Sequence, residues 1–157
     1  MSVGEWALIA SVVFAGLWSG LLAMVTTVLH PMMKPMDGSD FARFLRAFLP
    51  TARKAPFNFI AVIGMIVAPV VALFALDTGS DPFLLTAIGL AFVLIGPLAV
   101  SNRMAEPLYD EMLSWDPARP PGGWEAGRRR YFTINWIRAG ATWSAFGLFL
   151  AALVDRA

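Results

Sequence analysis

Four apolar stretches, each long enough to cross a lipid bilayer, dominate this sequence. They cover residues 6–29, 57–76, 82–101 and 132–154, and the first three contain no charged residue. A helix needs about 20 residues, at about 1.5 Å each, to cross a hydrocarbon core of roughly 30 Å. The fourth stretch carries one charge, that of Arg138. The sequence therefore predicts an all-α integral membrane fold, with four transmembrane helices in a single domain over residues 1–157.

Composition favours a membrane protein over a soluble domain. Apolar residues make up 58% of the chain and charged residues only 15%, which lies outside the usual balance of soluble domains. The apolar run over residues 6–29 is longer than a signal-peptide core and no basic residue precedes it, so we expect this segment to be retained. The absence of cysteine excludes disulfides, iron–sulfur clusters and thiolate metal sites.

Basic residues are concentrated in two of the three connections between the predicted spans. All but two of the 12 lysines and arginines fall there: Lys34, Arg43, Arg46, Arg53 and Lys54 in the first, and Arg103, Arg119, Arg128, Arg129 and Arg130 in the third. Such an excess marks cytoplasmic connections. We therefore expect a multi-pass protein of the inner (plasma) membrane with both termini on the non-cytoplasmic side. The net charge of +1 gives no reason to expect a nucleic-acid partner.

The connections also predict how the helices are arranged. Residues 77–82 separate the second and third spans so closely that these spans must be antiparallel neighbours, which favours an up-down four-helix bundle. In the first connection, Asp37 or Ser39 can cap a short amphipathic helix that Pro50 should end. We expect this helix to lie in the headgroup layer; the alternative is a lid folded over the bundle. Its apolar face carries Phe41, Phe44, Leu45, Phe48 and Leu49.

Glycine and proline interrupt the predicted spans. Gly16 and Gly20 form a GxxxG pair, a pattern that allows two membrane helices to approach closely. In the third span, Pro97 can kink the helix and free a backbone carbonyl. The segment after that span can continue as a helix, which Pro107 should bend or restart.

An arginine and an asparagine lie inside the fourth apolar stretch. Tyr131, Asn135, Arg138 and Thr142 are spaced four, three and four residues apart, so they share one face of a helix. An arginine at the centre of a membrane helix costs about 2.5–3.5 kcal/mol on insertion scales. We call this polar face the stripe and expect it to face the interior of the bundle. The alternative is that Arg138 snorkels to the nearby cytoplasmic surface.

Most other polar candidates fall at the cytoplasmic ends of the spans: His30, Asn58, Asn102, Glu106, Tyr109 and Asp110. Together with the stripe they would hold an anionic or phenolic small molecule at the mouth of the bundle. The alternative is that they anchor helix ends in the headgroups, with His30 an ordinary helix-end residue. A zinc site is not expected, because one histidine without cysteine leaves only carboxylate ligands.

The order of residues in the C-terminal half resembles that of a known family. Asn102, Pro107-Leu108-Tyr109 and Trp115 precede a proline-rich loop, and Arg130-Tyr-Phe-x-x-Asn135-x-x-Arg138 opens the last span. This pattern is similar to that of the anthrone-oxygenase-like family of small four-helix membrane proteins. The chain departs from the family pattern at Tyr109, where the family has a second asparagine.

The resemblance implies oxidation of a phenolic or anthrone-type carbon by dioxygen, without a metal or flavin cofactor. Deprotonation of such a substrate makes a carbanion or phenolate that can give an electron directly to oxygen. In that reaction His30 would be the base, Arg138 would hold the developing oxyanion, and Asn135 would orient the substrate. The expected substrate-binding residues are Asn58, Asn102, Glu106, Tyr109 and Tyr131.

The sequence supports two hypotheses of function. In the first, the protein binds a hydrophobic aromatic or quinone-like molecule at a cytoplasmic-side pocket and oxidises it without a cofactor. In the second, it is a non-enzymatic membrane protein or accessory subunit that packs against partner membrane proteins or a second copy of itself. Both hypotheses place the chain in a lipid bilayer.

Overall fold

The computed structural model describes residues 1–156, and no strand occurs among them. The first long helix is continuous through α1 (Val3–Met24), η1 (Val25–Leu29) and α2 (His30–Met33). Two separate helices follow, α3 (Gly38–Lys54) and α4 (Pro56–Ala75). The next long helix comprises α5 (Asp81–Val93), η2 (Leu94–Ala105) and α6 (Glu106–Ser114), and the last is α7 (Trp124–Arg156). The segments η1 and η2 are π-helical.

Four helices are long and apolar enough to cross a membrane: Val3–Met33, Pro56–Ala75, Asp81–Ser114 and Trp124–Arg156. Each coincides with one of the predicted spans, and three of them extend well past it. They indicate a multi-pass membrane protein, as the apolar stretches predict.

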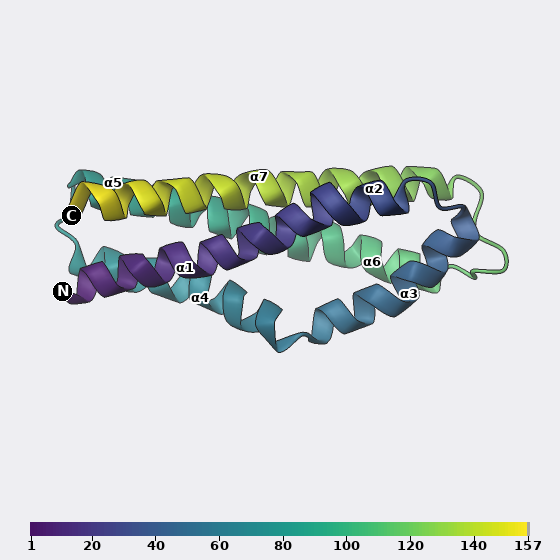
Figure 1. Cartoon of the computed structure of the whole chain (residues 1–157), viewed down its shortest axis with the longest axis horizontal. Coiled ribbons are helices and arrows are strands. Elements are labelled where there is room, and N and C mark those ends of the chain that lie inside the picture. The colour runs from purple at the N-terminus through teal and green to yellow at the C-terminus, as the bar shows by residue number, and fades with distance from the viewer. Residues whose placement is uncertain (157) are drawn as a thin grey trace.

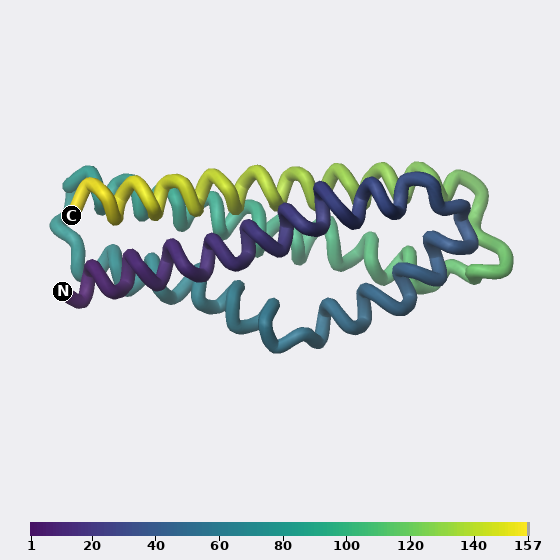
Figure 2. Tube along the Cα trace, viewed as in Figure 1, coloured from purple at the N-terminus to yellow at the C-terminus, as the bar shows by residue number. Residues whose placement is uncertain are grey.

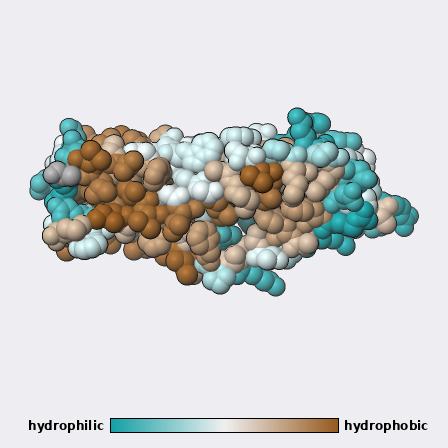
Figure 3. All heavy atoms as spheres, in the orientation of Figure 1, coloured by the Kyte–Doolittle hydropathy of each residue, from teal (hydrophilic) through white to brown (hydrophobic). Residues whose placement is uncertain are grey.

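The long helices lie side by side, and the chain runs back and forth between the two ends of an elongated molecule (Figure 1). α1 packs against α4 and α7, and α5 packs against α7 and α4. The start of α1 and the end of α7 lie at one end of the molecule, whereas the α2–α3 and α6–α7 connections lie at the other (Figure 2). Hydrophobic surface separates the hydrophilic atoms at these two ends (Figure 3).

The helix α4 is much shorter than the helices beside it. Its 20 residues span about 30 Å, whereas the 31 to 34 residues of the other three spanning helices reach about 46–51 Å. The helix α3 runs alongside the part of the molecule that α4 does not reach. The two helices meet at an angle, and their junction projects away from the rest of the bundle (Figure 1). We call residues 51–58, where α3 ends and α4 begins, the elbow.

Buried side chains form three clusters along the molecule. Two of them lie among the spanning helices and contain small residues such as Ala15, Ala61 and Ala72. The third lies at the end far from the termini, between α2, α3, η2, α6 and α7, and we call it the distal core. Its buried members are Met33, Phe41, Leu45, Leu49, Ala105, Leu108, Tyr109, Met112, Trp115, Tyr131 and Ile134.

Glycines permit close packing between some of the helices. A Cβ atom at Gly64 would collide with the ring of Phe14, and one at Gly96 would collide with the side chain of Ala141. By contrast, a Cβ atom at Gly20 would meet nothing within 4 Å. Within this chain the GxxxG pair therefore permits close approach at Gly16 alone, where a Cβ atom would lie 3.1 Å from the ring of Phe146.

The N-terminal cap and the apolar face of α3 agree with the predictions. The Asp37 carboxylate accepts a hydrogen bond of 2.8 Å from the backbone N–H of Asp40, so Asp37 is the N-cap. The predicted apolar face is buried in the distal core through Phe41, Leu45 and Leu49. α3 thus covers this end of the bundle as a lid, which was the alternative to a helix whose apolar face lies in the headgroups.

The prediction that Pro50 ends this helix is wrong, because α3 continues to Lys54. Pro50 lacks only the N–H that would reach the carbonyl of Arg46, and the helix tolerates this loss of one bond. The helix ends instead at Ala55, whose backbone is extended with ψ of 118°. Ala55 precedes Pro56, and a proline disfavours the helical conformation in the residue before it.

Candidate functional site

A cavity of about 850 Å³ lies between the elbow and the rest of the bundle. Small-molecule pockets occupy about 300–1,000 Å³, so the cavity is large enough for a ligand. Its lining includes apolar residues such as Leu22, Val62 and Pro97, together with polar side chains from the elbow, η2, α6 and α7. All the predicted site residues except His30 line the cavity: Asn58, Asn102, Glu106, Tyr109, Tyr131, Asn135 and Arg138.

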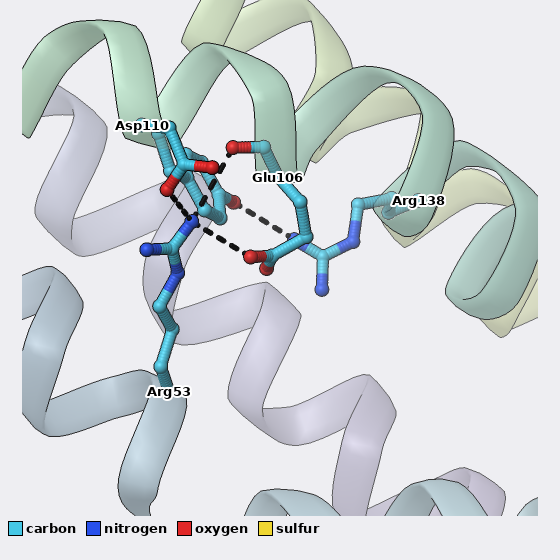
Figure 4. A network of polar contacts seen from close by, with 5 residues as sticks. Arg53, Glu106, Asp110 and Arg138 are labelled. Carbon is cyan, nitrogen blue, oxygen red and sulfur yellow. Dashed lines mark hydrogen bonds and ion pairs between the residues drawn. The ribbon is translucent and has the colours of Figure 1, made fainter.

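Arg138 reaches the cavity wall from the middle of α7. Its Nη1 donates hydrogen bonds of 3.1 Å to the hydroxyl oxygen of Tyr109 and 3.1 Å to Oδ1 of Asn135. Its Nε is buried without a hydrogen-bond partner, and none of the ion pairs among residues 1–156 includes Arg138. The guanidinium is directed toward α6 inside the bundle (Figure 4), as the predicted stripe requires. Arg138 therefore makes no direct ion pair with a carboxylate of the described chain.

A second arginine, Arg53 of α3, forms ion pairs with the acidic side chains of the cavity. Its Nη2 lies 2.7 Å from Oε2 of Glu106 and 2.8 Å from Oδ1 of Asp110 (Figure 4). Its guanidinium carbon also lies 5.6 Å from the centre of the Tyr109 ring, within cation–π range. Partial burial acts to lower the pKa of Arg53, but hydrogen bonding and charge from Asp110 and Glu106 outweigh it and raise the pKa above its ordinary value.

The tyrosines of the cavity connect these two arginines to the distal core. Tyr109 is 8% exposed and Tyr131 is 2% exposed, and their ring centres lie 5.8 Å apart. The side chain of Tyr109 touches Arg53 with its ring and Arg138 with its hydroxyl. The position where this chain departs from the family pattern is therefore occupied by a residue that contacts both cations.

His30 lies behind the cavity wall and does not line the cavity. Its ring is 4% exposed and stacks on the ring of Phe132 with centres 4.1 Å apart. Its Nε2 lies 3.5 Å from Nδ2 of Asn135, while its Nδ1 is buried without a partner. The predicted base would therefore reach a molecule in the cavity only through Asn135.

Asn58 and Asn102 line the cavity from different helices, α4 and η2. The Nδ2 of Asn58 donates a 2.8 Å hydrogen bond to the carbonyl of Ala52 and braces the elbow. Asn102 lies on η2 with its side chain on the cavity wall, next to the buried hydroxyl of Ser101. Asn58 therefore has a structural contact of its own, and Asn102 faces the cavity from the third span.

Two π-helical segments adjoin the cavity. The segment η2 contributes Pro97, Ser101 and Asn102 to its wall, and η1 contributes Val25. Prolines lack the N–H needed for the α-helical ladder, and the α register restarts at Glu106, just before Pro107, as predicted for Pro107. π-Helical turns within α-helices are frequent at functional sites. The sequence signal for the π-helical segment η2 is the pair of prolines ten residues apart.

Arg53 was not predicted as a site residue. In the sequence it was used only as one of the basic residues that indicate how the chain is oriented in the membrane. Trp18, which lies on the cavity wall at 4% exposure, was not predicted either. No periodic signal separates Trp18 from the other large residues of the first span. Within residues 1–156, no three His, Asp or Glu side chains lie together in a way that could hold a metal ion.

The arrangement offers donors to a negatively charged or electron-rich oxygen. The two arginines and the two carboxylates of the cavity sum to no net charge, but both carboxylates contact Arg53, and the guanidinium of Arg138 contacts only neutral groups. Aromatic rings of Trp18, Tyr109 and Tyr131 surround the remaining space. The cavity can thus hold an aromatic body with an oxyanion directed at Arg138.

The chain matches no protein-family model, no curated protein and no solved structure. The resemblance to the anthrone-oxygenase-like family therefore stays a prediction, and the function is inferred from the cavity itself.

Proposed function

We propose that this protein binds a hydrophobic aromatic or quinone-like small molecule in the cavity, with an oxyanion or phenolic oxygen of the ligand held by Arg138. The observation that carries this proposal is that Arg138, on the cavity wall, hydrogen-bonds only to neutral groups and keeps a buried Nε without a partner. An ionisable residue within a membrane helix is costly and is generally paired. Because both nearby carboxylates contact Arg53 and neither forms an ion pair with Arg138, a negatively charged oxygen of a ligand can supply the direct partner that Arg138 lacks.

The composition of the cavity wall supports an aromatic ligand body. Trp18, Phe48, Phe57, Tyr109 and Tyr131 contribute rings to it, and aromatic side chains pack well against flat aromatic ligands. The Asn102 and Asn135 amides add polar groups that can fix the orientation of the bound molecule.

Oxidation of the bound molecule by dioxygen is implied by the family resemblance alone. In such a reaction Arg138 would stabilise the oxyanion that develops on the substrate, and no cofactor is called for. The alternative, a non-enzymatic membrane protein or accessory subunit that packs against a partner, uses the same fold without turnover. Substrate-dependent oxygen uptake above the uncatalysed rate distinguishes the two.

We further propose that the chain is an up-down four-helix bundle of the inner membrane, with α3 at the level of the cytoplasmic headgroups and both termini outside the cytoplasm. The basic connections support this orientation. The chain contains no cysteine, so single cysteines report cleanly. Asp77→Cys should react with a membrane-impermeant maleimide from the outside of intact cells, and Lys34→Cys only after permeabilisation; the reverse pattern inverts the topology.

Binding is tested with lawsone, a hydroxynaphthoquinone that is ionised at neutral pH and quenches tryptophan fluorescence. The protein is placed in phosphatidylcholine nanodiscs, and empty nanodiscs correct for partitioning of the probe. Loss of a hydrogen bond to a charged group costs about 1.5–3 kcal/mol. Arg138→Gln should therefore weaken binding roughly 10- to 100-fold, and Arg138→Lys should weaken it less.

The matched control is Arg129→Gln, because Arg129 is an exposed cation of the same helix. It should leave the affinity for lawsone unchanged. If wild type and Arg138→Gln bind the probe equally, or if neither binds above the empty nanodiscs, the proposed site is wrong. Trp18→Phe should remove part of the quenching signal, whereas Trp6→Phe, which alters an exposed residue, should not.

A further inference from the structure

The opening of the cavity has an amphipathic rim. Residues that both line the cavity and are exposed on the molecular surface mark this rim: Met24, Thr51, Arg53, Phe57, Asn102 and Asp110. Met24 is 41% exposed and Phe57 is 44% exposed. The rim therefore has an apolar side, on α1 and α4, and a polar side on α3, η2 and α6. An opening into water alone would leave the apolar side exposed at a cost.

The apolar side of the rim lies one bilayer thickness from the opposite end of the molecule. At that end Gly4 of α1 packs against Ala75 of α4, where an added Cβ would lie 3.5 Å from the Ala75 side chain. Counting along each helix from this contact, Met24 lies about 30 Å away and Phe57 about 27 Å away. A hydrocarbon core is roughly 30 Å thick. Both residues therefore lie at the edge of the hydrocarbon when the other end of α1 and α4 is at the opposite edge.

The route to the cavity along the axis of the bundle is closed by the distal core. Arg128 ties the connection after α2 to α7, donating hydrogen bonds to the carbonyls of Met33 at 3.3 Å, Lys34 at 2.9 Å and Met36 at 2.9 Å. Arg46 of α3 donates a 2.7 Å hydrogen bond to the carbonyl of Trp115. Water-soluble molecules arriving from that end meet packed side chains rather than an opening.

We propose that the rim is a lateral portal, through which an amphiphile dissolved in the cytoplasmic leaflet places its oxyanion against Arg138 while its apolar tail stays in the bilayer. This inference rests on the proposed function, and it adds the ligand class and the direction of access. The polar side of the rim faces the headgroups, where Arg53 bridges α3 to Glu106 and Asp110 (Figure 4). The tail leaves the cavity between Met24 and Phe57, where the exposed surface is apolar.

Ligands with and without a long alkyl chain distinguish entry from the bilayer through the lateral portal from entry along the axis of the bundle. A head group joined to a long alkyl chain can occupy the cavity only if the chain has an apolar exit. Lawsone and a lawsone that carries a long alkyl chain on the ring carbon beside the hydroxyl share the same head. A lateral portal accepts both, whereas a cavity reached only from water accepts the soluble head and rejects the membrane-held one.

The test compares the two probes by fluorescence quenching in phosphatidylcholine nanodiscs. We expect both to bind wild type, and Arg138→Gln to weaken both. A second experiment blocks the portal. For this, Phe57→Cys is labelled, after folding, with a bulky thiol-reactive reagent. The matched control is Val71→Cys with the same label, since Val71 is 41% exposed on the same helix and does not line the cavity. The label at residue 57 should slow binding of both probes several-fold, and the label at residue 71 should not.

The outcomes keep the portal and the proposed function apart. If lawsone binds in an Arg138-dependent way but its alkylated form does not, the portal is overturned and the proposed site stands. If both probes bind and the label at residue 57 leaves their rates unchanged, the portal is likewise overturned. If neither probe binds wild type, the proposed function fails, and the portal fails with it.

Discussion

Nδ2 of Asn135 lies 3.5 Å from Nε2 of His30, in the interior of the bundle. The Oδ1 of the same amide accepts a hydrogen bond from Arg138. A cation prefers the oxygen end of an amide, so Arg138 fixes which way the Asn135 side chain points. The NH₂ end must then face His30, and it can donate a hydrogen bond only to an imidazole nitrogen without a proton.

We therefore expect His30 to be neutral, with its proton on Nδ1. His30 is the only histidine, so selective ¹⁵N labelling of histidine gives one pair of ring signals to assign. The Nε2 signal should be that of an unprotonated nitrogen at neutral pH. The substitution Asn135→Asp is the matched test, because a carboxylate accepts from both neighbours and should move the proton to Nε2. A protonated Nε2 in the wild-type protein contradicts this prediction.

Of the three consecutive arginines in the second turn of α7, only Arg128 should matter for stability. Its guanidinium bonds three backbone carbonyls and lies 4.7 Å from the Trp124 ring. Hydrogen bonds to charged groups contribute about 1.5–3 kcal/mol. Arg128→Ala should lower the thermal unfolding temperature in detergent by a clear margin, while Arg129→Ala, at an exposed position, should not. Equal effects of the two substitutions would show that charge alone is responsible.

Two glycine substitutions should have opposite consequences. In Gly96→Ala the new methyl group collides with the Ala141 side chain, which is short and cannot move without its backbone. Overpacking of this kind costs about 1–3 kcal/mol. In Gly20→Ala the methyl group meets nothing within 4 Å, and alanine favours a helix over glycine by roughly 0.5–1 kcal/mol. Chemical unfolding should therefore rank Gly20→Ala at or above wild type and Gly96→Ala below it.

The Arg53 ion pairs should hold the elbow without deciding global stability. Glu106 and Asp110 are 43% and 72% exposed, and exposed pairs contribute only about 0.2–1 kcal/mol. Arg53→Ala should speed hydrogen exchange over residues 50–58 while the unfolding temperature changes little. The control Arg43→Ala removes an ion pair with Asp40 on the outer face of α3 and should leave exchange at the elbow unchanged.

The pH dependence of Arg53 follows from the direction of its pKa shift. Its pKa is raised on folding, so its contribution is complete below the ordinary arginine pKa and is lost only as the pH rises past the raised value. Protection of the elbow by Arg53 should therefore stay constant from neutral to mildly alkaline pH. A loss of the difference between wild type and Arg53→Ala within that range would mean that another group holds the elbow.

The helices were predictable because membrane spans leave a strong local signal. Long apolar runs with at most one charge locate all four, and the spacing of Phe41, Leu45 and Leu49 identifies the buried face of α3. The end of α3 was placed at the wrong proline, since a single missing N–H does not end a helix whose side chains are well packed. The π-helical register of η2 depends on how neighbouring helices pack around Pro97, which no short sequence window contains.

The candidate site was predictable where residues share one helix and less so where they do not. Tyr131, Asn135 and Arg138 lie on one face of α7, and spacing alone indicated that they line the same space. The separation of His30 from the cavity could not be predicted, because the ring of Phe132 and the amide of Asn135 cover it from another helix. Arg53 was missed for the same reason, since its carboxylate partners lie more than fifty residues away along the chain.

In the proposed orientation, the short length of α4 divides the chain between two different solvents. Among the spanning helices, lipid tails are as apolar as leucine, so stability there depends on close van der Waals packing of small residues. In that orientation the distal core lies beyond the reach of α4, at the level of the headgroups and the adjoining water, where the burial of apolar side chains is itself favourable. The helix α7 belongs to both regions. Urea acting from the aqueous side will therefore loosen one half of a continuous helix while the bilayer still holds the other.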